Sequence, residues 1–410
     1  MAYSSDSPLP PPSRPVVVTG MGIISSMGRD LAENAAGFRA GRMAFSPVTL
    51  FDVSRQRVGT AGQVDLPDEP GKSWSRMDRG TRLALLAARE ALANAGLSGG
   101  EIPMVVGTSA AAMPIGEDYF KQALATPKHR GRQFRRVELY QAQRQMTDMA
   151  RVLNVGGPIR IISNACASGA NAIGQAFHLV RSGRADIVLA GGYDALCQLV
   201  FCGFDALQAL SPSGIPRPFD AERDGLALGE GAGFVIVESA ASAKARGVRV
   251  IAEILGYGAA TDVHHLTQPH PLGDAALVTM QAACSMAGLA PEQIDYINSH
   301  GTGTPLNDVA EGNAIQRWAR EAVGEIKVSS TKSAIGHLLG GAGAVESVIS
   351  LLAMEGQWLP ASLNVREADP VCSFDLVRTP CEAPVSRVLT NSFGFGGANA
   401  TLVFGKEGLT

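Results

Sequence analysis

Residues 159–174 read Ile159-Arg160-Ile161-Ile162-Ser163-Asn164-Ala165-Cys166-Ala167-Ser168-Gly169-Ala170-Asn171-Ala172-Ile173-Gly174. A short apolar run, a Ser-Asn pair and a run of small residues predict a buried strand, a tight turn and a helix with a close-packing Ala and Gly face. Cys166 falls at the turn, at or near the first residue of that helix. Unpaired N–H groups and the positive end of the helix dipole meet there, and both favour thiolate over thiol.

Two interpretations of Cys166 fit this local pattern. A thiolate at such a turn is a nucleophile with backbone donors beside it for an oxyanion. A free cysteine is also often a small buried hydrophobic residue without a chemical role. The pattern alone leaves both open, and the rest of the chain has to decide between them.

The composition indicates a large globular protein. The chain has 410 residues, enough for two or three packed units, and its 46% of apolar and 18% of charged residues allow a large core. A formal charge of −3 gives no reason to expect nucleic acid or an anionic membrane as partner. The six cysteines form no C-x-x-C pair, which argues against zinc and against a disulfide framework.

Neither a signal peptide nor a membrane span is predicted. Residues 4–15 are rich in Ser and Pro and lack an apolar segment, so we expect residues 1–14 to form a disordered N-terminal lead. No apolar run is long enough to span a bilayer. We therefore expect a soluble protein of a reducing cytoplasm.

The second half of the chain repeats the first, weakly but in order. Strand 159–165 delivers Cys166, and strand 326–331 delivers Lys332. Glycine-rich segments at 229–233 and 394–398 each enter a further strand. Strands alternate with helices, which predicts an α/β fold with largely parallel sheets, built from an N-terminal half over 15–255 and a C-terminal half over 256–408.

Reactive side chains follow several predicted strands of the second half. His300 comes directly after an apolar strand, Lys332 and His337 share one segment, and Phe393 lies in a glycine-rich one. A Cys-His hydrolase or acyltransferase would use one histidine as base and leave the other histidine and the lysine without a role. A scaffold that only binds a carrier protein would need none of these groups.

A decarboxylating Claisen condensation uses the whole set. The cysteine takes an acyl group as a thioester, and a malonyl-type thioester loses its carboxylate to become an enolate. Two neutral imidazoles that donate N–H bonds to the thioester carbonyl would stabilise the developing negative charge. The enolate carbon then attacks the acyl group on the cysteine.

Five motifs resemble those of the β-ketoacyl-acyl-carrier-protein synthases, specifically the elongating, type II-like branch of the thiolase superfamily. The resemblance runs from Val16 to Phe404. The motifs are Asn164-Ala165-Cys166-Ala167-Ser168-Gly169, Asp220-Ala221-Glu222-Arg223-Asp224-Gly225, His300-Gly301-Thr302-Gly303-Thr304-Pro305-Leu306-Asn307-Asp308, Ser329-Ser330-Thr331-Lys332-Ser333-Ala334-Ile335-Gly336-His337 and Asn391-Ser392-Phe393-Gly394-Phe395-Gly396-Gly397.

The resemblance implies a thiolase-like five-layer αβαβα fold of two similar halves and a catalytic role for four residues. Cys166 is implied to be the acylated nucleophile, and His300 and His337 to line the decarboxylation site. Lys332 is implied to support the histidines, with Glu346 as the carboxylate linked to that lysine.

The resemblance also implies a gate and a binding tunnel. Phe393 stands at the gating position, and its N–H with that of Cys166 would form the oxyanion hole. Thr302 and Thr304, with Thr267 as a weaker candidate, are implied to bind the phosphopantetheine arm of acyl carrier protein. Plain turn chemistry is the alternative for Thr302 and Thr304. No cofactor is expected on the chain itself.

Two segments depart from the common bacterial pattern of that family. Residues 121–150 begin with a basic stretch, which is either a solvated surface or a docking patch for an acidic partner such as the carrier. Residues 193–210 include Phe204, a candidate acyl-pocket residue, and Gln208, where many relatives have an arginine. The acyl chain therefore stays open, as does the choice between a homodimer and a heterodimer with a chain-length-factor-like subunit, in a fatty acid or a type II polyketide or polyene pathway.

Overall fold

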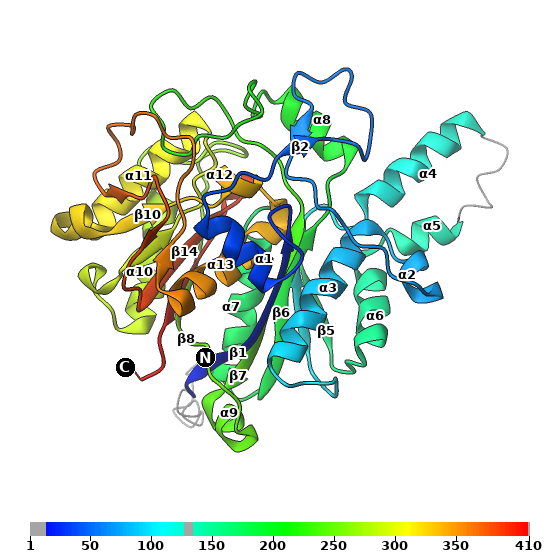
Figure 1. Ribbon diagram of the computed structural model, residues 1–410, viewed down its shortest axis with the longest axis horizontal. Helices are drawn as coiled ribbons and strands as arrows, with labels where there is room; N and C mark the ends of the chain where they lie inside the picture. The colour runs from blue at the N-terminus through cyan, green and yellow to red at the C-terminus, as the bar shows by residue number, and fades with distance from the viewer. Residues whose placement is uncertain (1–13, 127–133, 409–410) are drawn as a thin grey trace, which may run out of the picture.

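The computed structural model describes residues 14–126 and 134–408 (Figure 1). Of the predicted disordered lead over residues 1–14, residues 1–13 therefore lie outside the described residues.

The central sheet has 11 strands in the order β12-β10-β9-β14-β15-β8-β1-β7-β6-β4-β5. Its two halves meet where β1 pairs with β8, through Val17–Glu253 and Val18–Ala252. The strands of the first half are β1 Val16–Ser25, β4 Met104–Gly107, β5 Ile159–Ile162, β6 Ile187–Asp194 and β7 Gly231–Ser239. Those of the second are β8 Ala252–Thr261, β9 Tyr296–Asn298, β10 Lys327–Ser329, β12 Asp375–Leu376, β14 Arg387–Phe393 and β15 Ala398–Gly405.

The two halves have the same topology. The order β1-β7-β6-β4-β5 in the first half corresponds to β8-β15-β14-β9-β10 in the second. In the first half only β7 runs against the other strands, and in the second only β15 does. The predicted internal repeat is thus present as two largely parallel sheets joined edge to edge.

Helices complete a five-layer arrangement. The helices α7 (Ser168–Arg181) and α13 (Ala342–Gly356) contact strands of both halves and lie between them. The helices α3 (Arg79–Asn94) and α6 (Ala142–Leu153) cover the outer face of the first half, and α10 (Asp274–Ala287) and α11 (Pro305–Ala319) cover that of the second. Figure 1 shows α10 and α11 on the left, α7 and α13 in the middle, and α3 and α6 on the right. The predicted thiolase-like αβαβα fold is confirmed.

The small residues of the central helices let them approach closely. A Cβ atom at Gly169 in α7 would lie 2.8 Å from the backbone nitrogen of Ala344 in α13. Such a distance is too short for two non-bonded heavy atoms, so the helix crossing requires glycine there. The predicted Ala and Gly face of the helix after Cys166 is therefore the face that packs against its counterpart from the other half.

The remaining elements decorate this core. A pair of helices, α4 (Met113–Ala125) and α5 (Phe134–Leu139), projects from the first half at the right of Figure 1. The other elements are α1 Leu31–Arg39, β2 Ser46–Pro47, β3 Thr60–Ala61, α2 Lys72–Arg76, α8 Gln198–Ala206, α9 Ala240–Arg246, η2 Pro291–Gln293, η3 Arg320–Glu325, α12 Lys332–Ile335, η4 Leu339–Gly341, β11 Trp358–Leu359, β13 Cys381–Glu382 and η5 Phe395–Gly397. None of the helices in residues 14–126 and 134–408 is long and apolar enough to cross a membrane.

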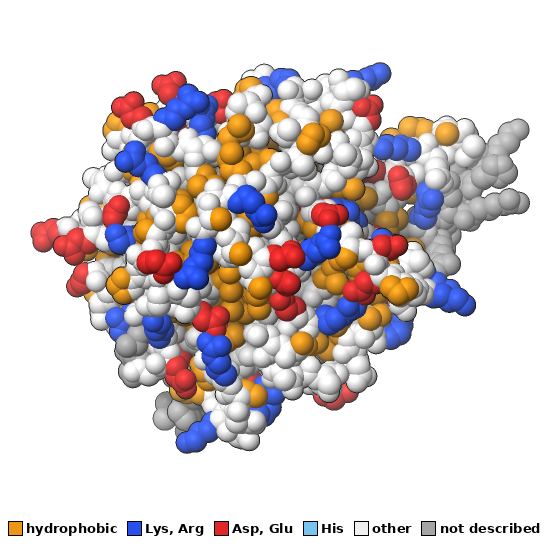
Figure 2. Space-filling view, viewed as in Figure 1, with side chains coloured by type: hydrophobic (Ala, Val, Ile, Leu, Met, Phe, Trp, Pro, Cys, Tyr) orange, Lys and Arg blue, Asp and Glu red, His pale blue; other side chains and the backbone are white. Residues whose placement is uncertain are grey.

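The face of the molecule shown in Figure 2 has no large patch of side chains that all carry the same charge. Lys and Arg side chains are interspersed there with Asp and Glu side chains (Figure 2). Part of the basic stretch noted in the sequence, including Lys128, Arg130 and Arg132, lies outside the described residues.

Candidate active site

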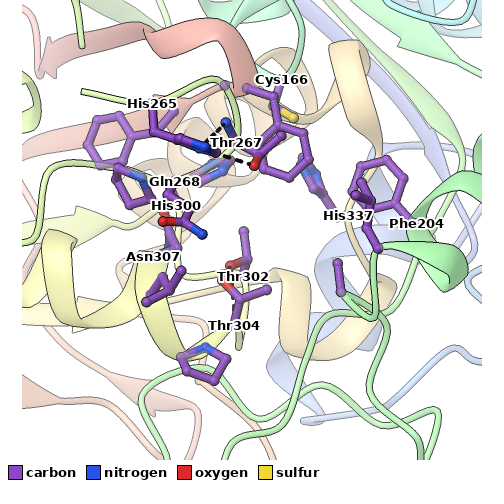
Figure 3. Close-up of a pocket in the computed structure, with 18 of the residues that line it drawn as sticks. Cys166, Phe204, His265, Thr267, Gln268, His300, Thr302, Thr304, Asn307 and His337 are labelled. Carbon is purple, nitrogen blue, oxygen red and sulfur yellow. Dashed lines mark hydrogen bonds between the residues drawn. The ribbon is translucent and has the colours of Figure 1, made fainter. Parts of the chain in front are cut away.

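The predicted reactive residues meet at the carboxyl ends of parallel strands. β5 leads to Cys166, β9 to His300, β10 to Lys332 and His337, and β14 to Phe393. A cavity of about 370 Å³ is lined by Cys166, both histidines and Phe393. Figure 3 shows Cys166, His300 and His337 around this one cavity. The junction of the two halves thus brings together groups that lie far apart in the sequence.

The turn that presents Cys166 is held by its own side chains. Ala165 has a φ of 54°, a left-handed conformation that tightens the turn before the cysteine. The Ser168 hydroxyl donates to the Ala165 carbonyl at 2.6 Å and accepts from the Asn164 N–H at 2.9 Å. Helix α7 begins at Ser168, so Cys166 lies just before the helix, close to the predicted position.

The acidity of Cys166 differs from the prediction. Burial raises the pKa of its thiol to about 12, against the opposing effects of the Lys332 charge and a hydrogen bond from the Phe395 backbone. The expectation of a depressed pKa at the helix start is therefore wrong in direction. The side chain is only 7% exposed, and loss of hydration disfavours the thiolate more than the nearby donors favour it.

The two histidines face one another in the same cavity. Their ring centroids are 5.3 Å apart and the planes meet at 86°. Burial, followed by the Lys332 charge, holds the pKa of both His300 and His337 well below the usual value. Each ring is therefore neutral at neutral pH. The Nδ1 atoms are buried without a hydrogen-bond partner in the described part of the chain, so Nε2 is the nitrogen available to the cavity.

A buried glutamate that the sequence did not reveal holds the His300 turn. Glu311 of α11 accepts the backbone N–H of His300 at 2.8 Å and that of Gly301 at 2.7 Å. The Asn391 side chain on β14 donates to the same carboxylate at 3.1 Å. Burial raises the pKa of Glu311 to about 7. In the sequence, Glu311 could have been noticed only as an acidic residue among the apolar residues of the α11 segment.

Lys332 and Glu346 form a buried ion pair behind the histidines. Their side chains are 2% and 3% exposed, and the Lys332 ammonium donates to Glu346 Oε1. Burial raises the pKa of Glu346 to about 7, although the Lys332 charge opposes this shift. Neither residue lines the cavity. The charge of Lys332 nevertheless lowers the pKa of Cys166, His300 and His337. The residues that the structure describes contain no cluster of three His, Cys, Asp or Glu side chains able to hold a metal ion.

The glycine-rich segment after β14 approaches Cys166. The resemblance assigns the second oxyanion donor to Phe393, and that assignment stays a prediction. A hydrogen bond from the Phe395 backbone opposes the raised pKa of the Cys166 thiol. The Phe393 ring packs against His300, with centroids 5.6 Å apart. The Phe395 ring stacks on Phe204 at 5.7 Å and 14°, and both of these rings line the cavity.

The three predicted threonines also line the cavity. The hydroxyls of Thr302 and Thr304 lie 2.8 Å apart, and the Thr267 N–H donates to His265 Nδ1 at 3.2 Å (Figure 3). The Thr304 N–H also donates to the Thr302 hydroxyl at 3.3 Å, which is turn chemistry. The turn bond of Thr302 is therefore compatible with its place on the cavity wall, and the phosphopantetheine role stays a prediction.

Comparison with known proteins adds family information to this geometry. Residues 13–243 match the model "Beta-ketoacyl synthase, N-terminal domain", and residues 251–366 match "Beta-ketoacyl synthase, C-terminal domain". The 3-oxoacyl-[acyl-carrier-protein] synthase 2 of Synechocystis sp. is 38% identical, over 95% of this chain and 98% of that protein. The protein of the same name from Staphylococcus aureus is 37% identical, again over 95% and 98%.

Solved structures resemble the chain over nearly its whole length. A chain of the ishigamide ketosynthase/chain length factor is 36% identical with a TM-score of 0.90, covering 97% of this chain and 100% of that one. A chain from a type II polyketide acyl-carrier protein in complex with its ketosynthase is 30% identical with a TM-score of 0.88, covering 96% and 100%. A β-ketoacyl synthase from Burkholderia phymatum is 33% identical with a TM-score of 0.85, covering 96% and 99%.

Proposed function

The chain belongs to the β-ketoacyl synthase family, and from that premise we propose that it condenses a Cys166-bound acyl chain with malonyl-acyl carrier protein to give 3-oxoacyl-acyl carrier protein and carbon dioxide. The observation that carries the proposal is the cavity in which one cysteine faces two neutral histidines. A Cys-His hydrolase does not account for a pair of histidines that face each other with a buried lysine behind them.

Acyl transfer to Cys166 comes first. The sulfur attacks the carbonyl of an acyl thioester, the bond to the pantetheine sulfur breaks, and the thiol proton leaves with that sulfur. The tetrahedral oxyanion needs donors fixed before the reaction. The N–H of Phe395, whose backbone favours the thiolate of Cys166, and the N–H of Cys166 itself are the proposed donors. In this proposal Phe395 takes the place of Phe393 as the second donor.

Decarboxylation of the malonyl group follows. His300 and His337 donate N–H bonds to the malonyl thioester carbonyl, so that carbon dioxide leaves and the electron pair is held as an enolate. A charged imidazolium would instead pair with the malonyl carboxylate, and the low pKa of both rings prevents this. The enolate carbon attacks the acyl carbonyl, and Cys166 departs and regains a proton.

The carrier's phosphopantetheine arm is proposed to enter between Thr267 and the pair Thr302 and Thr304. All three lie along the cavity that ends at Cys166. The acidic carrier itself is proposed to use the basic stretch over residues 121–136. Charge reversal at Arg132 and Arg135 should raise the KM for carrier-bound substrate, and this increase should shrink as salt rises. An unchanged KM would remove that stretch from the docking surface.

We also propose that the chain pairs with a second copy of itself. Strand β5 ends the sheet and has no strand on its outer edge in the described ranges. On α4, Phe120 and Leu124 are 63% and 62% exposed, one turn apart. An open strand edge and exposed apolar side chains are each typical of a surface that another chain covers.

Sedimentation of the purified protein tests this pairing. A dimer that becomes a monomer when Phe120 and Leu124 are changed to Asp would support it. A monomeric wild type that is active only after addition of a chain-length-factor-like subunit would establish a heterodimer instead. All six cysteines are unpaired, and a reducing cytoplasm would keep the Cys166 thiol available for acylation.

Reconstitution with carrier-bound substrates tests the reaction itself. We expect the purified protein to release labelled carbon dioxide from carboxyl-labelled malonyl carrier protein and to form a 3-oxoacyl product detectable by mass spectrometry. Release of free acid without carbon dioxide would refute the condensation and establish a hydrolase. The mass of the Cys166 adduct formed from assorted acyl carrier proteins would identify the acyl chain and hence the pathway.

A further inference from the structure

Asp194, at the end of β6, is a buried carboxylate outside the predicted site. Its side chain is 0% exposed and does not line the cavity. An ionised carboxylate in such a place must be compensated by hydrogen bonds. It accepts four bonds from the turn after β4, namely Thr108 Oγ1 at 2.6 Å, Ser109 N at 2.9 Å, Ala110 N at 2.9 Å and Ala111 N at 3.0 Å.

The turn over residues 108–111 in turn holds the nucleophile. The Ser109 hydroxyl donates to the carbonyl of Ala165 at 2.8 Å, and Ala165 immediately precedes Cys166. Any shift of the 108–111 turn would therefore move the backbone that presents the sulfur. Asp194 is thus connected through Ser109 to the backbone that immediately precedes Cys166.

The same carboxylate also reaches the second half of the protein. Asp194 Oδ2 accepts the N–H of Gly340 at 2.7 Å. Gly340 belongs to η4, which begins two residues after His337 and leads into α13. One side chain is thus bonded both to the turn that supports the cysteine and to the turn that follows a histidine.

We propose that Asp194 is a positioning residue that fixes the Cys166 turn relative to the His337 turn, so that the enolate carbon reaches the acyl carbonyl. This inference rests on the proposed condensation. Acyl transfer needs only the cysteine turn, and decarboxylation needs only the histidines, which have their own supports in Glu311 and the Lys332–Glu346 pair. Of the three steps, only condensation requires the Cys166 turn and the His337 turn to keep a fixed position relative to one another.

The bonding pattern of Asp194 suggests a selective variant. Oδ1 takes the bonds from Thr108, Ala110 and Ala111, whereas Oδ2 takes those from Ser109 and Gly340. In Asp194→Asn, the amide oxygen can keep the first set. The NH2 group would then face the N–H groups of Gly340 and Ser109, donor against donor. The Ser109 N–H can still donate to the remaining oxygen, from which it lies 3.3 Å away in the wild type, whereas the connection to the second half is lost.

The matched control is Glu238→Gln. Glu238 lies at the opposite end of the β6–β7 pair and is also 0% exposed. It accepts comparable bonds from Thr19 at 2.8 Å, Ser242 at 2.6 Å and Arg246 at 2.9 Å. Its substitution should cost similar stability without touching either catalytic turn.

The experiment measures acylation of Cys166, carbon dioxide release and 3-oxoacyl formation on the same full-length preparations. Displacement of reacting groups by 1 Å can cost about 10²-fold in rate. For Asp194→Asn we therefore expect condensation to fall by about 10–10²-fold while acylation and decarboxylation stay within about threefold. The ratio of carbon dioxide released to product formed should rise in proportion, whereas Glu238→Gln should leave that ratio at the wild-type value.

Two results would overturn the proposal. One is an unchanged ratio in Asp194→Asn, and the other is an equal loss of all three activities that the control also shows. If Asp194→Asn does not fold, Ser109→Ala removes the link to Ala165 from an exposed position, and an unchanged ratio there would equally refute the relay. A wild type that releases no carbon dioxide from malonyl carrier protein would refute the proposed function itself, which is a separate outcome.

Discussion

Replacing either cavity histidine by alanine should slow decarboxylation far more than acylation. In the proposed reaction, His300 and His337 each donate one N–H bond to the malonyl thioester as it becomes an enolate. Loss of one such oxyanion-type donor typically costs about 2.7–4 kcal/mol of transition-state stabilisation. At about 1.36 kcal/mol per tenfold change in rate, this corresponds to a decrease of about 10²–10³-fold.

The structure supports a value within that range for each ring. Both imidazoles are buried and neutral, so each donor acts in a water-poor cavity with little screening. The two ring centroids are 5.3 Å apart, and in the proposed reaction both rings donate to the same thioester carbonyl oxygen. The double variant should therefore cost less than the sum of the two single losses, because groups that act as a unit are not additive.

The assay follows the two half-reactions separately. Carbon dioxide release is measured from carboxyl-labelled malonyl carrier protein, and acylation from the mass of the Cys166 adduct. His178→Ala is the control, because this exposed histidine of α7 contacts the Phe177 and Tyr257 rings and does not line the cavity. A wild-type rate of carbon dioxide release in His300→Ala or His337→Ala would refute the role of that ring. A collapse of acylation alone would make it the base for Cys166 and restore the hydrolase interpretation.

Four further predictions concern Cys166 and the groups around these rings. Cys166→Ala should abolish the covalent acyl adduct without unfolding the protein, and an adduct that persists would place the nucleophile elsewhere. Because the pKa of the Cys166 thiol is raised to about 12, its alkylation by iodoacetamide should rise by about tenfold per pH unit from pH 7 to 9 without a plateau. Lys332→Met should slow this alkylation further, since a positive charge that favours the thiolate is lost, whereas Lys327→Met on the surface should not. Glu311→Gln should reduce carbon dioxide release by about tenfold through the loosened His300 turn, and equal losses in both half-reactions would contradict this.

The site residues that could be predicted from the sequence all lie in short local motifs. Cys166, His300 and His337 each follow an apolar strand and lie among glycines and hydroxyl residues, so their position at a strand end can be predicted from a few neighbours. The internal repeat could also be predicted, because equivalent glycine-rich segments precede equivalent strands in the two halves. Such features depend on residues close together in the chain.

The features that the sequence did not identify depend on contacts across the fold. Phe393 and Phe395 have the same side chain two positions apart, and only the backbone path through η5 decides which N–H meets the cysteine. Glu311 and Asp194 are acids whose partners include backbone groups of turns elsewhere in the chain, at His300 and Gly340 respectively. The raised pKa of Cys166 comes from burial, which a strand-turn-helix pattern does not report.

The charge of Lys332 favours the deprotonated form of both Cys166 and the two histidines. Its charge lowers the pKa of Cys166, which favours the thiolate, and lowers the pKa of both histidines, which favours the neutral rings. The nucleophile and the N–H donors therefore benefit from the same cation, although one must lose a proton and the others must not gain a second one. Glu346 anchors that cation, and it also raises the pKa of Cys166. Since the ammonium acts on both half-reactions, removal of Lys332 should impair acylation and decarboxylation together, whereas loss of a histidine should separate them.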